Sequence, residues 1–156
     1  VASPGGRRWL DLTELHQDIG VCLVNPCLEM ITRLRFRALG PEYRFAHERM
    51  ARRKVHALPI LNVGVVGAVR DGRLADVRIS IGPVAVKPLR VRQAEALLEG
   101  QAAGPRVIRE AAELVASLCQ PRDSLLRGSG EYRRALAAVL VRRALERVAG
   151  LSHEGV

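Results

Sequence analysis

The sequence predicts an α+β fold in which a small antiparallel β-sheet packs against a layer of about three helices. Segments with the two-residue apolar period of strands lie in the first half of the chain, and segments with helical periodicity follow from residue 90 onwards. An Asp71-Gly72 pair between two strand-like runs indicates a tight hairpin, because both turn residues must adopt positive φ. Strands and helices segregated in this way favour helices on one face of an antiparallel sheet.

The composition indicates an aliphatic core. The chain has 156 residues, of which 48% are apolar but only 3% aromatic. This length fits one domain, or one domain with a piece of another appended, and it is long enough to bury a core of Val, Leu, Ile and Ala. The shortage of aromatic rings counts against a surface that stacks the bases of single-stranded nucleic acid.

The N-terminal part is expected to be largely irregular. Residues 10–12 suggest a short strand followed by one helical turn at 13–15, and residues 18–27 indicate a loop. Residues 29–38 alternate between a mostly apolar face and a basic face, which predicts a strand that ends at Gly40-Pro41. Residues 43–51 form a further candidate strand.

The central hairpin has the clearest strand signal. Residues 57–69 are rich in valine, and residues 74–81 alternate Leu74, Asp76, Arg78 and Ser80 against Ala75, Val77, Ile79 and Ile81. Gly82-Pro83 ends the second strand, and residues 84–86 are expected to continue the sheet after a bulge. Gly64 and Gly67 lie inside a strand with no helix after them, so they favour close packing of a helix on the sheet over a dinucleotide site.

Three helices are predicted after the sheet. The first spans residues 90–99 and ends at Gly100, the second starts at Pro105 and runs to about residue 119, and the third spans about 130–149 with Ser129 as its N-cap. The apolar stripe of the third helix is predicted to contain Tyr132, Leu136, Val139, Leu140 and Val148. Its outer face is predicted to carry Arg133, Arg134, Arg142, Arg143, Glu146 and Arg147.

The charge is strongly positive, at +9, and almost all of it comes from arginine. The arginines are spread along the chain beside acidic residues at helical spacing, so we predict no nucleic-acid binding. A basic nucleic-acid binder is the alternative, and it would bind with an affinity that falls steeply as the salt concentration rises. One basic cluster contains Arg49, Arg52, Arg53 and Lys54. It either neutralises a phosphate or a partner's acidic surface, or is a solvated strand end.

No catalytic residue and no metal site is predicted. His16, His47, His56 and His153 are far apart in the sequence and none has ligand spacing to a cysteine. Asp123 beside Ser124 is expected to brace a turn rather than to activate a nucleophile. The N–H groups of Gly128-Ser129-Gly130 form either an anion site or a plain helix start, and the plain start is favoured.

The cysteines and the N-terminal segment indicate where in the cell the protein is found. Three cysteines without a pairing pattern indicate reduced thiols, and neither a signal peptide nor a membrane span is predicted, so a cytoplasmic location is expected. The chain starts at Val1 rather than Met, which suggests a trimmed start or cleavage from a longer polypeptide.

Several of these segments together resemble a known family. They are residues 29–36, the basic step at 51–54, the run at 57–63, the hairpin through Asp71-Gly72, and residues 78–84 with 87–90. The most specific is Pro121-Arg122-Asp123-Ser124-Leu125-Leu126-Arg127-Gly128-Ser129, followed by 131–134 and 141–145. The chain resembles the C-terminal part of the FAD-binding (medium) subunit of the carbon monoxide dehydrogenase and xanthine dehydrogenase family of molybdenum hydroxylases.

The resemblance implies a domain organisation and a role. Residues 1–40 would be the tail of an FAD-binding domain, 41–150 a CO dehydrogenase flavoprotein C-terminal-like domain, and 151–156 a tail. The complete subunit would hold FAD and pass electrons, with an iron–sulfur subunit, a molybdopterin subunit and the missing N-terminal FAD-binding half as partners. The alternative is a stand-alone, non-catalytic interaction module of the same fold. In either case we expect no enzyme activity from the chain alone.

The resemblance also implies cofactor-binding residues. Ile31 matches the position where the backbone of a closing strand touches the flavin, and Glu48 or Arg49 matches the position where relatives often have a lysine near it. Glu48 there would be a change of charge. His56 stands where relatives frequently have an acidic residue. The glycine-rich segments that hold the FAD pyrophosphate in the family have no match in this chain.

Overall fold

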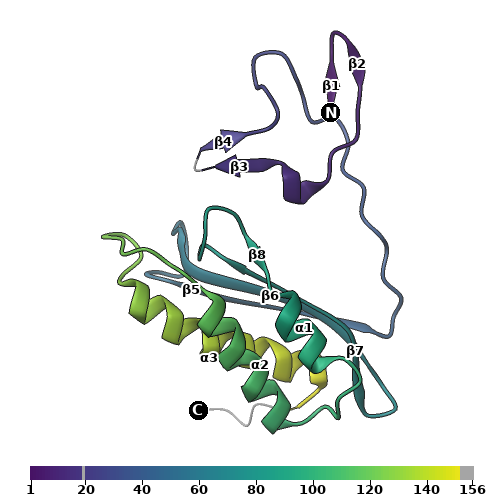
Figure 1. Ribbon diagram of the computed structural model, residues 1–156, viewed down its shortest axis with the longest axis vertical. Coiled ribbons are helices and arrows are strands. Elements are labelled where there is room, and N and C mark those ends of the chain that lie inside the picture. The colour runs from purple at the N-terminus through teal and green to yellow at the C-terminus, as the bar shows by residue number, and fades with distance from the viewer. Residues whose placement is uncertain (19, 152–156) are drawn as a thin grey trace. The chain divides into compact units, whose positions relative to one another are not determined.

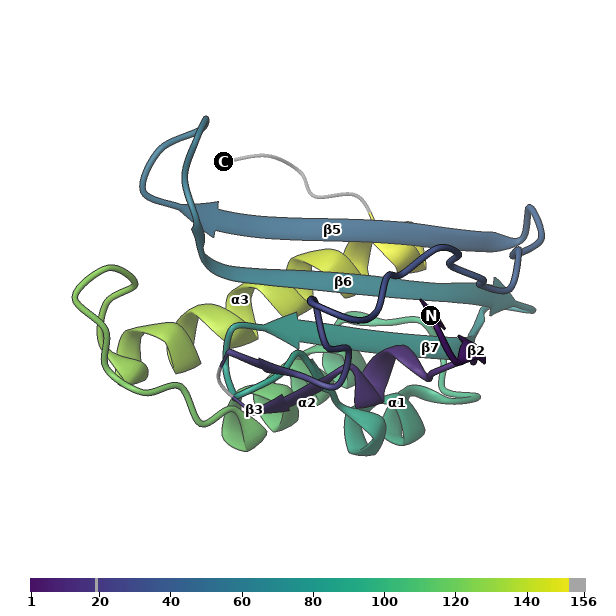
Figure 2. The same ribbon diagram turned by 90° about the horizontal axis from the view of Figure 1, so that it is seen from above.

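The computed structural model describes residues 1–18 and 20–151, and the chain divides into two compact units, residues 1–39 and 40–156. Unit 2 is built on one four-stranded sheet. Its strands are consecutive in space as in sequence, and every neighbouring pair is antiparallel. They are β5 (Tyr43–Ala51), β6 (Pro59–Arg70), β7 (Arg73–Gly82) and β8 (Leu89–Arg90), and Figure 2 shows the first three side by side.

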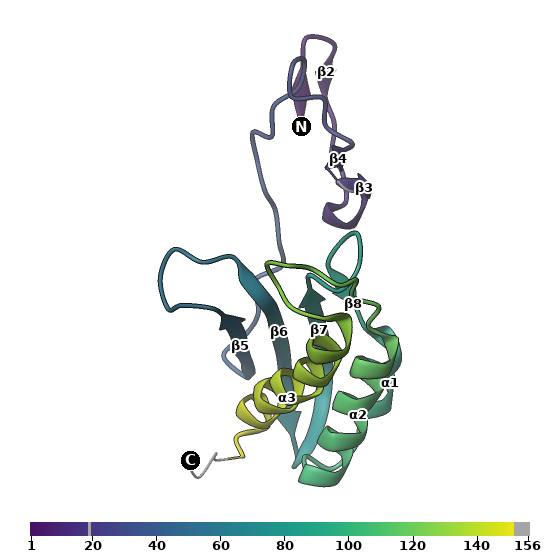
Figure 3. The same cartoon turned by 90° about the vertical axis from the view of Figure 1, so that its left-hand side faces the viewer.

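Three helices cover one face of this sheet, which confirms the predicted α+β fold (Figure 1, Figure 3). Helix α3 (Gly130–Ala149) packs along β5 and β6, helix α1 (Arg92–Leu98) packs on β7, and helix α2 (Pro105–Leu118) lies between α1 and α3. The core between the layers is aliphatic, as the composition indicates, and its largest fully buried side chains include Leu61, Leu74, Ile79, Ile81, Leu98, Ile108, Leu140 and Leu145.

The hairpin between β6 and β7 turns at Asp71 and Gly72, with φ values of 50° and 72° as the prediction requires. A bulge follows in β7. Val66 lies opposite Arg78 and Ala68 opposite Ala75, so two residues of β7 face one of β6, and Asp76 adopts a φ of 52°. The bulge corrects the predicted alternation, because it brings Leu74 to the same buried face as Val77 and Ile79.

The two strand glycines have different environments. A Cβ on Gly67 would lie 3.1 Å from Val77 Cγ2 and 3.4 Å from Val148 Cγ1, so this glycine does permit the close packing of α3 on the sheet. A Cβ on Gly64 would meet only the ring of Phe45, at 3.8 Å, among the described atoms. The prediction is therefore confirmed for Gly67 and wrong for Gly64.

The free edge of β7 is closed by side chains as well as by backbone. Residues 83–88 leave the sheet, so the predicted continuation at 84–86 is wrong, and the strand β8 that pairs with the second edge of β7 has only two residues. Beyond them, Glu95 Oε1 accepts a hydrogen bond from Ile79 N at 2.9 Å, and Glu99 Oε2 accepts one from Asp76 N at 2.9 Å. Two carboxylates four residues apart, one on α1 and one at its C-cap, therefore take the place of a strand.

Helix α3 is rotated relative to its predicted orientation. Its N-cap is Ser129, whose hydroxyl accepts from Tyr132 N at 3.1 Å, as predicted. Leu136, Leu140 and Val148 are buried, but the predicted stripe members Tyr132 and Val139 are exposed, and Arg133 is only 4% exposed. The orientation is set by the small residues Ala137 and Ala144 and by Arg133, which bonds to backbone carbonyls, so a count of large apolar residues places the face wrongly.

Unit 1 contains little regular structure. It has a β1–β2 hairpin (Ala2–Ser3 and Gly6–Arg7), a 3₁₀ turn η1 (Leu12–Glu14), and a β3–β4 pair (His16–Asp18 and Val21–Cys22). The strand predicted at 29–38 is wrong, because among the described residues only Met30 forms a β-bridge, to Ala2. An alternating pattern needs a neighbouring strand to bond. The strand at 10–12 and the loop over all of 18–27 are likewise corrected by η1 and by the pair β3–β4.

The three cysteines are predicted to differ in reactivity. Cys22 and Cys27 are exposed, whereas Cys119 is buried, and this burial raises the pKa of the Cys119 thiol from 9.0 to about 11. The thiolate is the reactive form, so Cys119 should resist alkylation while the native protein is kept at pH 8. Mass spectrometry after iodoacetamide treatment should find two modified cysteines, and a third only in denaturant. Rapid labelling of Cys119 in the native protein would contradict its burial.

Candidate functional site

Three loops gather at one end of unit 2: residues 52–58, 83–88 and 119–129 (Figure 1). The sheet register brings the first two together, because Ala51 pairs with Pro59 and Asn62 pairs with Gly82. The third loop joins the end of α2 to the start of α3. We refer to these three loops as the loop end, and the third of them contains the most specific segment of the family resemblance, residues 121–129.

Arginine side chains tie the loop end to backbone carbonyls. Arg52 Nη2 donates to Leu125 O at 2.6 Å and so links the first loop to the third. Arg53 donates from Nε and Nη2 to His56 O, at 3.1 and 2.7 Å, and Arg49 donates to Ala57 O. The three arginines of the basic cluster are therefore part of the framework that shapes these loops, while all four members of the cluster are exposed to solvent.

Arg133 is the buried link between the second and third loops. Its Nη1 donates to Pro83 O at 3.0 Å, and its Nη2 donates to Arg122 O. Burial lowers the pKa of the Arg133 guanidinium, and the nearby charge of Arg127 lowers it further, while Asp123 opposes the shift. The guanidinium stays charged, since an arginine is not deprotonated in proteins, and its charge strengthens both hydrogen bonds.

The start of α3 is a plain helix cap rather than a vacant anion site. Asp123 Oδ1 accepts from Gly130 N at 2.7 Å, and Ser129 Oγ accepts from Tyr132 N. A Cβ on Gly130 would lie within 2.3 Å of Pro121 O, so glycine is required there. Ser124 Oγ accepts from Arg127 N at 3.3 Å. The prediction that Asp123 braces this connection is confirmed, and the favoured plain start is confirmed with it.

The predicted cofactor residues lie in both units. Ile31 is in the extended segment of unit 1, half exposed, and within the described residues its backbone makes no hydrogen bond. Glu48 and Arg49 are neighbours on β5 of unit 2 and point to opposite faces of the sheet. Glu48 faces the helices, where its Oε1 lies 3.0 Å from Arg147 Nη1, whereas Arg49 is exposed on the open face.

The described residues contain neither a cluster of metal ligands nor a membrane-spanning helix. Across residues 1–18 and 20–151, no group of three or more His, Cys, Asp and Glu side chains is arranged to hold a metal ion. None of the helices in that part of the chain is long and apolar enough to cross a membrane. His153 and the tail after Leu151 lie outside the described residues.

Residues 46–148 of the chain match the family model of the CO dehydrogenase flavoprotein C-terminal domain. The chain belongs to this family. The match includes β6, β7, all three helices and the three loops of the loop end.

Two curated medium subunits are similar to the chain, and one of these matches extends beyond this domain. The medium chain of carbon monoxide dehydrogenase from Afipia carboxidovorans is 26% identical over 147 residues, which cover 94% of this chain and 50% of the relative. The nicotine 6-hydroxylase medium subunit from Paenarthrobacter nicotinovorans is 39% identical over 87 residues, covering 55% of this chain and 30% of that protein. This chain therefore spans about half the length of these curated relatives or less.

A solved structure supports the same assignment. In the carbon monoxide dehydrogenase from Hydrogenophaga pseudoflava that lacks the Mo-pyranopterin moiety of its cofactor, one chain aligns with a TM-score of 0.86 and 28% identity. The alignment covers 95% of this chain and 50% of that chain, so it extends over residues of unit 1 as well as unit 2.

The sequence places Leu125 and Leu126 in the segment that resembles the family, but their exposure was not predicted. Leu125 is 98% exposed and Leu126 is 69% exposed. A signal for them does exist, because a pair of leucines inside a connection rich in Pro, Ser, Gly and Arg has no helical or strand period to bury it. The linking role of Arg133 had no such signal, since one arginine among several on a helix looks like part of a solvated face.

Proposed function

We propose that this chain is the C-terminal portion of the flavoprotein subunit of a molybdenum hydroxylase, where it supports FAD-mediated electron transfer and helps to dock the partner subunits. The observation that carries the proposal is the alignment of 95% of the chain with half of a carbon monoxide dehydrogenase chain at a TM-score of 0.86. Local matches to a common domain would cover unit 2 alone, whereas this alignment includes residues of the predicted flavin-domain tail.

The residues present fit a supporting role at the flavin. The backbone groups of Ile31 are available for the polar edge of a ring system. Arg49 offers a guanidinium on the open face of the sheet, although one of its N–H groups is bonded to Ala57 O. Glu48 fits less well, because its carboxylate is paired with Arg147 of α3. FAD would supply the redox chemistry, and these residues would only position it.

A flavin titration tests the proposal. The complete subunit that contains this chain should show a bound-flavin absorption spectrum, whereas the 156-residue chain alone should bind no FAD. In the complete subunit, Arg49→Ala should weaken FAD binding about tenfold if Arg49 contributes a charged hydrogen bond to the cofactor. Arg109→Ala, on the outer surface of α2, is the matched control and should leave FAD binding unchanged.

The outcomes separate the two candidate functions. A complete subunit that remains colourless with added FAD would overturn the flavoprotein assignment and favour the non-catalytic interaction module. That module predicts a folded, monodisperse protein that binds no flavin even beside the missing N-terminal half.

A further inference from the structure

The loop end concentrates the exposed apolar surface of unit 2. Eight large hydrophobic side chains are exposed in the described part of this unit, and five of them belong to the three loops, so the distribution is not the usual scatter of single residues. The five are Val55, Leu58, Val86, Leu125 and Leu126.

The same loops are strongly basic. They carry six cationic side chains and a single carboxylate, that of Asp123, which is already occupied in capping α3. The cationic side chains are Arg52, Arg53, Lys54, Lys87, Arg122 and Arg127. Aliphatic side chains with arginines around them are typical of the centre and rim of a protein–protein interface.

The loops are also held in place before any partner binds. Arg52 fixes the backbone at Leu125, and Arg133 fixes the backbones at Pro83 and Arg122. A short bridge between Ser124 and Gly128 closes the tip that carries the two leucines. A surface arranged in this way loses less conformational entropy on binding than a flexible one.

The complement of this surface is not found in the chain itself. Unit 1 carries five arginines against four carboxylates, so its net charge is not negative and cannot balance the cationic loops: Arg7, Arg8, Arg33, Arg35 and Arg37 against Asp11, Glu14, Asp18 and Glu29. A second copy would present the same basic loops, and like charges facing each other oppose association. Neither unit 1 nor self-association therefore satisfies the charge of the loop end.

We propose that the loop end is a docking surface for another subunit of the assembled enzyme, one whose contact surface has an aliphatic centre and a rim of Asp and Glu. This inference rests on the proposed function, because it takes the assembly for granted. Nucleic acid is the less suitable occupant, since none of the three loops has a Phe, Tyr or Trp side chain to stack on a base, and five aliphatic side chains gain nothing from a phosphate backbone.

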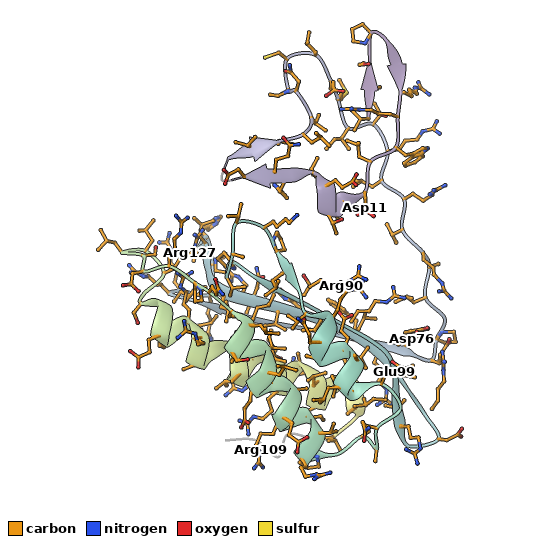
Figure 4. The ribbon with its side chains drawn as sticks, in the orientation of Figure 1. Asp11, Asp76, Arg90, Glu99, Arg109 and Arg127 are labelled. Carbon is orange, nitrogen blue, oxygen red and sulfur yellow. The ribbon has the colours of Figure 1, made fainter. Side chains whose placement is uncertain are left out.

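The experiment uses the complete flavin-containing subunit and the other subunits from the same source, each immobilised separately. Surface plasmon resonance would compare the wild type with Leu125→Glu/Leu126→Glu and with Lys54→Glu/Arg122→Glu. The matched controls are Val139→Glu, an exposed apolar residue on α3, and Arg109→Glu, which lies at the other end of the unit from Arg127 (Figure 4). FAD content and thermal unfolding of each variant verify its fold.

We expect each loop-end variant to weaken binding to one of the subunits at least tenfold, the controls to bind as the wild type, and wild-type binding to weaken as salt rises. Unchanged binding by both loop-end variants, in subunits that keep their FAD, would overturn the docking surface while leaving the proposed function intact. Loss of FAD from the folded loop-end variants would assign the surface to the subunit's own flavin-binding half and equally overturn the proposal. Loss of FAD from the wild type would instead refute the proposed function.

Discussion

Replacing Glu95 with alanine should destabilise unit 2 by about 2–4 kcal/mol. The Glu95 side chain is almost completely buried and accepts three strong hydrogen bonds, one from Ile79 N at 2.9 Å and two from Arg90, whose Nε and Nη2 each approach within 3.0 Å. Removing it leaves the N–H of Ile79 without an acceptor and the Arg90 guanidinium without its carboxylate. Urea unfolding followed by circular dichroism measures the loss, and hydrogen exchange should show faster exchange at Ile79.

Two variants calibrate this result. Glu95→Gln keeps an acceptor for Ile79 N but loses the charge, so it should cost less than the alanine variant. Glu110→Ala removes an exposed carboxylate that lies 3.9 Å from Arg106 one turn away, and it should change stability by less than about 0.5 kcal/mol. If Glu95→Ala is no less stable than Glu110→Ala, the carboxylate does not hold the edge of the sheet.

Replacing Arg133 with leucine should cost about 2–3 kcal/mol and loosen two loops together. Leucine can fill much of the buried volume but cannot donate, so Pro83 O and Arg122 O both lose their partner. Hydrogen–deuterium exchange should rise in residues 83–88 and 119–129 and remain unchanged in β6. Hydrogen–deuterium exchange does not depend on bound FAD, so it reports on the order of these two loops directly.

Lysine is the informative comparison at this position. Arg133→Lys keeps the positive charge but has one nitrogen, which cannot reach two carbonyls with the geometry of a guanidinium, so it should recover only part of the loss. Arg142→Leu, on the exposed face of α3, is the control for adding an apolar residue to this helix. Equal exchange rates in the two loops for Arg133→Leu and Arg142→Leu would show that Arg133 does not link them.

The parts of the fold that sequence predicts are those decided by local chemistry. Asp71-Gly72 forms its turn because the two residues tolerate positive φ, Pro105 starts α2 because it needs no N–H there, and Ser129 caps α3 with its own hydroxyl. Each of these depends on residues within a few positions of one another. The strand pattern of β6 and β7 is similarly strong, because alternate residues such as Val63 and Val65 in β6, and Val77 and Ile79 in β7, are buried on one face.

The parts that sequence misses depend on distant partners. The bulge at Asp76 shifts the phase of β7 and has no glycine to mark it. Glu95 and Arg133 look like surface residues of amphipathic helices, and only their backbone partners in β7 and in the loops explain their burial. Residues 29–38 have the alternation of a strand, but among the described residues only Met30 pairs with another segment, at Ala2.

The same distinction applies to the candidate site. Ile31, Glu48 and Arg49 were assigned by resemblance, and they stay predictions, although the pairing of Glu48 with Arg147 separates it from Arg49. The loop end was not predictable as a surface, because its three loops are separated by up to about seventy residues and meet only through the sheet register and the length of α3.

The two carboxylates of α1 have a consequence for how the sheet can grow. One edge of the sheet is finished with β8, with Glu95 and Glu99, and with residues 100–102, which bond to Leu74 and Arg73. A further strand cannot be added there without displacing a helix. Growth is therefore possible only along β5, whose outer edge has no partner among the described strands and carries the exposed Arg44 and Arg49. These charges disfavour strand pairing with a second copy at that edge. The β7 edge of the sheet is therefore blocked because its backbone groups are already hydrogen-bonded, and the β5 edge is protected by positive charge.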